Sequence, residues 1–169
     1  MSGRYQRKGI TLIELLVILA VVMILTLTSI PLFTSLIQHY RISSAVEDLY
    51  ASLQYARTES IKRNTPVYVS FTTGDSWCYG INTSSTCNCT TAGSCNLGSV
   101  SATAAGLLTL SATGLSSNSI FFDNTHGGVS SAATITYTLY GQSSLITTSI
   151  SRLGNIQTCS TGISGYTAC

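Results

Sequence analysis

The amino-acid sequence predicts an α+β protein in which a long N-terminal α-helix packs on a C-terminal, antiparallel β-rich domain. Three observations support this prediction. An apolar run begins at residue 10, a helical repeat of apolar residues follows it, and strict alternation replaces that repeat after Pro66. The 169 residues suffice for one soluble domain of ordinary size and a membrane segment, but not for two large domains.

Residues 1–9, MSGRYQRKG, form a short, polar and basic leader. The leader holds three of the eight basic residues, so the net charge of +2 falls to about −1 without it. Charged residues make up 8% of the chain, against about 25% in a typical globular protein. A surface with so few charges suits an extracytoplasmic protein that is surrounded by other proteins.

Residues 10–30 are predicted to be a membrane-spanning helix, the first half of the long helix. This segment is apolar except at Thr11, Glu14, Thr26, Thr28 and Ser29. Its length, at about 1.5 Å per residue, matches the hydrocarbon core of a bilayer. The basic flank is expected to stay on the cytoplasmic side of the membrane. The C-terminal part is therefore expected to lie outside. A secretory signal peptide is disfavoured because no small-residue cleavage site follows the run.

Residues 31–64 are predicted to continue the helix in amphipathic form. Apolar residues recur there at helical spacing, at Ile42, Val46, Leu49, Leu53 and Ala56. Asn64-Thr65-Pro66 is expected to end the helix. Pro31 lies inside it and is expected to kink or loosen it, because proline lacks the N–H group and clashes with the preceding turn.

Residues 65–169 are predicted to form the β-rich domain. Alternating segments bounded by Gly and Asn predict strands at 67–71, 77–81, 107–110, 119–122, 134–139 and 145–150. Residues 82–105 are rich in Ser, Thr, Cys and Ala, so we expect a disulfide-tied loop there.

Glu14 is the most informative single residue. A carboxylate near the centre of a bilayer costs about 2.5–3.5 kcal/mol on insertion scales, so something must compensate it. One possibility is that Glu14 lies close enough to the cytoplasmic interface to stay hydrated. The other is that it meets a cation, which cleavage after Gly9 would create as a new amino group on Ile10 of a neighbouring subunit.

Residues 8–16, KGITLIELL, resemble the class III signal of type IV prepilins and type II secretion pseudopilins. The resemblance implies that a prepilin peptidase cuts between Gly9 and Ile10 and methylates the new N-terminus, although Ile10 replaces the commoner Phe. It also implies that Glu14 sets the axial register between subunits and that the helix loosens at Pro31 in the filament. The predicted fold is then pilin-like.

Residues 45–64 are similar to the end of the long helix in the GspH/FimT/FimU group of minor pilins. Ile120-Phe121-Phe122 with Gly127-Gly128 resembles a hairpin of that group without its proline, and residues 150–154 resemble its C-terminal end. Taken by themselves, Arg57, Glu59 and Arg63 are interpreted as a solvated helix end rather than as a binding site.

Some members of the group bind DNA through a C-terminal Gly-Arg-x-Arg. The aligned residues here are Gly154-Asn155-Ile156-Gln157, so both arginines are absent. Phosphate binding depends on Lys and Arg, and beyond the helix only Arg152 is basic. We therefore predict no DNA-binding residues, and nucleic acid is a disfavoured partner.

The six cysteines all lie beyond the membrane segment, at Cys78, Cys87, Cys89, Cys95, Cys159 and Cys169. Their even number in an exported domain predicts disulfides rather than a metal cluster, which would show paired C-x-x-C spacing. Cys159 and Cys169 are expected to close a terminal loop. Cys78 is expected to pair with Cys87 or Cys89, and Cys95 with the other.

No catalytic set is present. His39 and His126 are the two histidines, and no acidic pair, Ser/His/Asp set or phosphate loop accompanies them. Asp123 and Asn124 are interpreted as turn residues rather than calcium ligands. We predict no enzymatic activity, no cofactor and no metal.

The main functional expectation is a minor pilin that helps initiate or cap a type IV pilus. The alternatives are a GspH-type pseudopilin of a type II secretion system, a major pilin, a FimT-like DNA-uptake pilin and a tethered enzyme, the last two disfavoured. The expected partners are other pilins, prepilin peptidase, an inner-membrane assembly platform and, before assembly, membrane lipid. The expected location is the bacterial inner membrane, single-pass with a periplasmic C-terminal domain, and then the filament.

Overall fold

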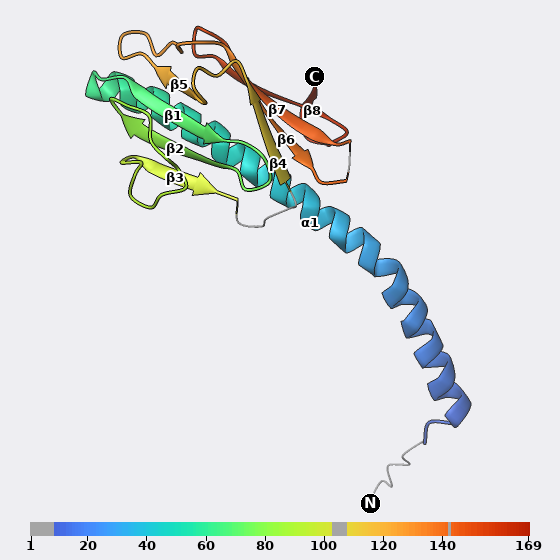
Figure 1. Ribbon diagram of the computed structural model, residues 1–169. Coiled ribbons are helices and arrows are strands. Elements are labelled where there is room, and N and C mark those ends of the chain that lie inside the picture. Colours follow the sequence, from blue (N-terminus) through green and yellow to red (C-terminus); the bar gives the residue numbers. More distant parts are fainter. Residues whose placement is uncertain (1–8, 103–107, 142) are drawn as a thin grey trace, which may run out of the picture. The chain divides into compact units, whose positions relative to one another are not determined.

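A computed structural model describes residues 9–102, 108–141 and 143–169, with the side chains of 28–32 excepted (Figure 1). Most of the predicted leader, residues 103–105 of the predicted loop, and Leu107 lie outside the described residues. The chain divides into two compact units, Met1–Ile37 and Gln38–Cys169, and one helix, α1 (Leu12–Arg63), runs from the first into the second.

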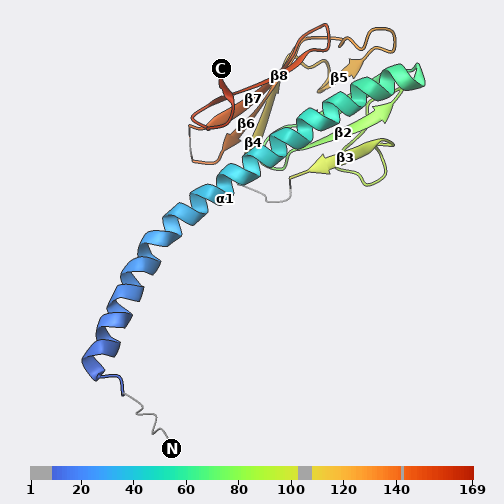
Figure 2. The same cartoon turned by 180° about the vertical axis from the view of Figure 1, so that it is seen from behind.

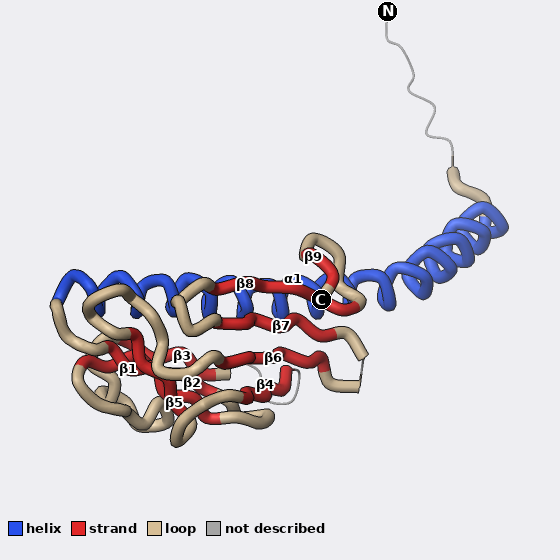
Figure 3. The backbone as a smooth tube through the Cα atoms, turned by 90° about the horizontal axis from the view of Figure 1, so that it is seen from above, coloured by secondary structure: helices blue, strands red, loops and turns tan. Residues whose placement is uncertain are grey.

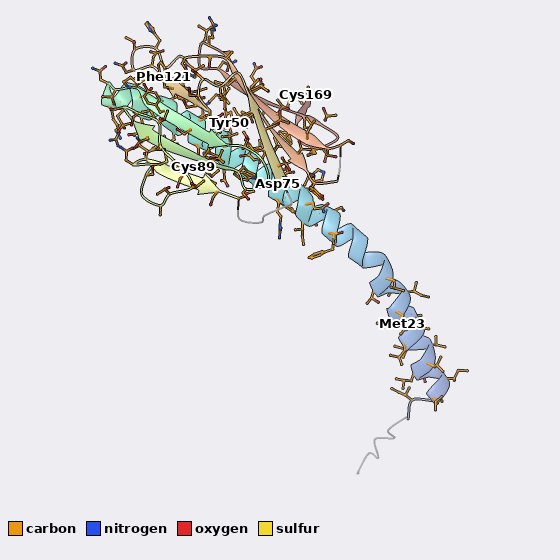
Figure 4. All side chains as sticks on the ribbon, in the orientation of Figure 1. Met23, Tyr50, Asp75, Cys89, Phe121 and Cys169 are labelled. Atoms are coloured by element: carbon orange, nitrogen blue, oxygen red, sulfur yellow. A yellow bond between two sulfur atoms is a disulfide. The ribbon has the colours of Figure 1, made fainter. Side chains whose placement is uncertain are left out.

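The first unit contains the start of α1. The large apolar side chains from Ile10 to Leu27 are each at least 49% exposed, including Met23, which Figure 4 labels. The helix is continuous through Pro31, so that proline does not end it. Within the described residues, no helical segment is both long enough and apolar enough to cross a membrane.

In the second unit, α1 supplies the centre of the hydrophobic core. The predicted amphipathic face is confirmed, because each of its five residues is at most 1% exposed: Ile42, Val46, Leu49, Leu53 and Ala56. These side chains pack with the inward-facing residues of two sheets, along which this part of the helix lies (Figure 2).

The predicted end of the helix is also confirmed. Asn64 adopts a left-handed conformation, with a φ of 53°. The amide of Asn64 donates to the Ile61 carbonyl and that of Thr65 to the Ser60 carbonyl, each at 3.2 Å. This is the Schellman arrangement, in which two otherwise unpaired helix carbonyls find donors.

Four of the described strands form the first sheet, in the order β3-β2-β1-β5, and all neighbours are antiparallel. Their bounds are β1 Val67–Thr72, β2 Cys78–Thr83, β3 Gly98–Ser101 and β5 Ser119–Phe122. β3 corrects the prediction that 82–105 is a loop throughout. Its four residues contain one large apolar side chain, Val100, so no alternation revealed it.

The second sheet has the order β4-β6-β7-β8-β9 (Figure 3). Its strands are β4 Leu108–Thr113, β6 Ala133–Leu139, β7 Leu145–Ile150, β8 Ile156–Thr161 and β9 Thr167–Ala168. Buried and half-buried residues alternate along all of β6, as a half-buried strand requires. Two strands were not predicted: β8, where Ile156 is the single large aliphatic residue, and β9, which pairs parallel to β8.

The fold makes a direct prediction about stability. Leu53→Ala should lower the free energy of unfolding by about 2–5 kcal/mol, because it removes a fully buried side chain and leaves a cavity. The matched control is Leu153→Ala, at a position 83% exposed, which should change stability by less than about 0.5 kcal/mol. Denaturant unfolding of the full-length protein in detergent checks both values, and equal losses would contradict the assigned core.

Candidate functional site

The predicted cleavage site lies just before the first turn of α1. Gly9 and Ile10 are exposed and precede the helix, which begins at Leu12. A Cβ atom at Gly9 would meet no atom within 4 Å, so the fold itself does not require glycine there. An exposed bond outside regular structure is the kind of bond that a peptidase can reach.

Glu14 closes the first turn of the helix. The Thr11 hydroxyl accepts a bond from the Glu14 amide at 3.4 Å, while Glu14 Oε2 lies 3.5 Å from both the amide and the hydroxyl of Thr11. Thr11 and Glu14 thus occupy the N-cap and N3 positions of a capping box, here with long bonds. This role of Glu14 was not predicted, although the spacing Thr-x-x-Glu before an apolar run indicates it.

The end of α1 is fastened to two distant loops. Arg57 Nη1 donates to the Gly154 carbonyl at 3.0 Å, and Nη2 lies 3.5 Å from the Leu153 carbonyl. The Ser60 hydroxyl lies within hydrogen-bond distance of two carbonyl acceptors, that of Asp123 at 3.0 Å and that of Arg57 in its own helix at 2.8 Å. We call Arg57, Ser60 and the loop segments 123–128 and 151–154 the helix-end clamp.

The structure corrects the interpretation of a solvated helix end for Arg57 and Glu59, whereas Arg63 is exposed as that interpretation expects. Arg57 is half-buried against the loop, and the Glu59 side chain is only 6% exposed. Glu59 accepts a bond from Lys62 Nζ at 3.2 Å and is bonded to Arg63 Nε. The Arg63 bond is the main reason that the pKa of Glu59 lies below its ordinary value. These residues stabilise the fold. Their contacts give no reason to assign them a binding role.

Two glycines allow the clamp to close. A Cβ atom on Gly154 would lie 2.1 Å from the Gly127 carbonyl, and one on Gly127 would lie 2.9 Å from Arg57 Nε. Both residues also have positive φ, 77° and 64°. Any larger residue at Gly154 would therefore push the two loops apart.

Asp123 organises the turn after β5. Its carboxylate accepts bonds from the amides of His126 at 2.7 Å and of Thr125 and Gly128 at 2.8 Å. The bond from His126 contributes most to holding the pKa of Asp123 below its ordinary value. This geometry agrees with the turn interpretation, and the described residues contain no group of side chains that could hold a metal ion.

The cysteines form three disulfides, Cys78–Cys89, Cys87–Cys95 and Cys159–Cys169. Of the two pairings that the sequence left open, the structure has Cys78 bonded to Cys89, the residue labelled in Figure 4. The first two bonds interlock along the chain and lie over Gly80 of β2. A Cβ atom on Gly80 would come within 2.2 Å of Cys95 Sγ, so β2 needs glycine at this position.

Comparison with known proteins gave two family matches, one at the start of the chain and one over most of the second unit. Residues 4–30 match the family described as the prokaryotic N-terminal methylation motif, and residues 45–154 match the family described as type II transport protein GspH. Comparison with curated proteins and with solved structures gave no match.

A methylation motif at the start of a long helix, together with a domain of two sheets packed on its second half, defines a pilin-like protein. The GspH match spans more than half of the chain and includes the helix-end clamp. The chain belongs to the GspH family of type II transport proteins, a family of structural rather than enzymatic proteins. The matched family supports the GspH alternative better than the main expectation of a type IV minor pilin.

The clamp predicts the effect of removing its arginine. Arg57→Ala should lower the free energy of unfolding by about 1–3 kcal/mol, because the Gly154 carbonyl loses its charged donor. Arg152→Ala, at an exposed position of the same loop, should cost less than about 0.5 kcal/mol. Chemical denaturation measures both, and an Arg57 variant as stable as the Arg152 variant would disprove the clamp.

The bonds of Glu59 to Lys62 and Arg63 predict that the stability of the fold depends on pH. A carboxyl group whose pKa is lower in the folded state stabilises the fold above its unfolded pKa, about 4.3, and this contribution is lost as the pH falls through the folded value. Wild type should therefore melt above Glu59→Gln at pH 7, and the gap should narrow below about pH 4. Glu47→Gln, at an exposed position of the same helix, controls for loss of a negative charge. A constant gap in melting temperature from pH 7 to pH 3 would contradict this assignment.

Proposed function

We propose that this chain is a pseudopilin of a type II secretion system, cut after Gly9 and then built into a pseudopilus. The observation that carries the proposal is the combination of the two family matches on one chain, the methylation motif at residues 4–30 and GspH at 45–154. In this role the protein acts as a structural subunit that joins other pilin-like subunits.

Before assembly, residues 10–30 hold the chain in the inner membrane and the second unit lies in the periplasm. The basic leader supports this orientation. The three disulfides of the second unit support it as well, since such bonds persist in an oxidising compartment. The exposed apolar side chains of the first unit require cover, first from lipid and then from the helices of neighbouring subunits.

Cleavage changes the electrostatics at the start of the helix. It removes the basic leader and leaves an amino group on Ile10, and N-methylation would preserve its positive charge. Glu14 exchanges its long capping bonds for the stronger attraction of that cation on a neighbouring subunit, in surroundings that contain little water. Pairing of this kind fixes the axial step between subunits, while Pro31 loosens the helix as the filament forms.

DNA uptake is not part of this proposal. The segment Gly154-Asn155-Ile156-Gln157 carries no cation, and Gly154 is occupied in the helix-end clamp. A soluble fragment that shifted labelled DNA at physiological salt would contradict this.

Deletion of the gene separates the two filament systems. The proposal expects loss of protein secretion, with pili, twitching and transformation unchanged. Loss of pili and twitching with normal secretion would instead support the type IV pilus, which shares the same kind of N-terminal motif.

The cation pair gives a prediction for the mature subunit. Glu14→Ala should still be processed, because cleavage precedes pairing, yet it should be absent from sheared filaments. Gly9→Ala is the companion variant and should accumulate as a longer, unprocessed membrane protein. Immunoblots of membrane and filament fractions check both, and normal incorporation of Glu14→Ala would refute the register role.

A further inference from the structure

Among the residues that the structure describes, no strand pairs with the side of β3 that faces away from β2. The amide of Ala102 donates to the Trp77 carbonyl at 2.9 Å, which directs Ala102, and by alternation Val100 and Gly98, toward β2. The N–H and C=O groups of Ser99 and Ser101 therefore point away from the sheet. An edge of this kind is a template for another strand.

The other sheet edges in the described parts of the chain are covered or very short. Leu110 on β4 exchanges two bonds with Gly74, at 2.8 and 3.2 Å. On β5, the Phe121 carbonyl accepts a bond from the Ser130 amide at 3.0 Å, and β9 has only two residues. β3, by contrast, contains no charged residue or proline, and it pairs with β2 in one continuous register from Gly98 to Ser101. It therefore lacks the charges and the proline that protect many edge strands.

A groove runs beside this edge, with a volume of about 350 Å³. Ala51, Ser52 and Tyr55 of α1 form one wall, Tyr79 of β2 contributes to the floor, and β3 forms the other wall. Ser52 Oγ and Tyr79 OH are bonded to each other at 3.3 Å. All of the lining residues are uncharged, so the groove suits apolar and hydroxyl-bearing side chains.

The edge is also held in place before any partner arrives. The Cys87–Cys95 bond ends two residues before Leu97, whose amide donates to the Ile81 carbonyl at 3.1 Å. Asn96 adds a side-chain bond to the Thr83 hydroxyl at 2.7 Å. A preorganised edge lowers the entropy that binding must overcome.

We propose that β3 and this groove bind an extended, uncharged segment of a different pilin-like subunit, which adds a strand beside Ser99 and Ser101. Alternate side chains of that segment enter the groove, while its backbone bonds to the open edge. The inference rests on the proposed function for the kind of partner.

The choice of a different subunit follows from symmetry. In a second copy of this chain, loops bond to the other described edges at Leu110 and Phe121, and β9 has only two residues, so β3 is its open described edge. Pairing of β3 with β3 gives a closed dimer, whereas a filament grows through contacts between unlike surfaces. The segment therefore comes from another member of the assembly.

Photo-crosslinking in cells tests this. The full-length chain carries benzoylphenylalanine at Ser99, with Ser111, an exposed residue of β4, as the matched control and Val22 of α1 as the reference for assembly. Ser99 should give an adduct that mass spectrometry identifies as another pilin-like subunit, and Ser111 should not give the same adduct.

No adduct from Ser99, or adducts only with a second copy or an exported substrate, would overturn the inference whenever Val22 still links to pilin-like subunits. Absence of pilin adducts from Val22 as well would count against the proposed function itself.

A proline scan tests the backbone bonds separately. Ser99→Pro removes an N–H that points outward, and an edge strand tolerates this change. With the crosslinker at Ser101, Ser99→Pro should reduce the adduct at least tenfold, whereas Ser99→Ala should leave it unchanged. Intact disulfides and an unchanged melting temperature control for folding. If Ser99→Pro melts early, Ser101→Pro with the crosslinker at Ser99 replaces it, and an undiminished adduct overturns strand addition.

Discussion

Both β-sheets depend on one strip of helix surface. The side chains from Ile42 to Ala56 lie on a single face of α1 and are buried by residues of both sheets. Directly after this face, Arg57 and Ser60 of the same helix lie within hydrogen-bond distance of loops that follow β7 and β5. Hydrophobic burial thus brings the sheets to the helix, and directed bonds at the helix end fix where the loops lie. Glycine at 127 and 154 is the condition for that second step.

The sequence predicted those features whose cause is local. The helix face follows from spacing, the helix end from Asn64 and Pro66, and β6 from unbroken alternation. β3 and β8 were missed because each has a single large aliphatic residue and is held by its neighbours in the sheet. The acceptors of Arg57 are backbone carbonyls 96 and 97 residues away, and backbone groups leave no mark in a sequence. The choice between Cys87 and Cys89 likewise depended on how the loop lies over Gly80.

The two units of the chain differ in whether their apolar side chains are buried within the unit. The second unit buries its apolar residues internally, around α1. The first unit leaves its apolar side chains exposed along the helix. The backbone amides at the start of its helix are capped locally, through Thr11 and Glu14. A contiguous exposed apolar surface of this kind marks a site of contact with a membrane or with another protein. The family matches divide the chain in a similar way, with the methylation motif over residues 4–30 and GspH over residues 45–154.

The interlocked disulfides have a mechanical consequence. A subunit that pushes or is pulled along a filament carries load through its backbone. If β2 and β3 were torn apart, the chain between Cys78 and Cys95 could not straighten, because the bonds 78–89 and 87–95 offer a short covalent path across it. This path is on the order of 40 Å shorter than the fully extended chain from Cys78 to Cys95. The segment therefore behaves as a short tether of fixed length.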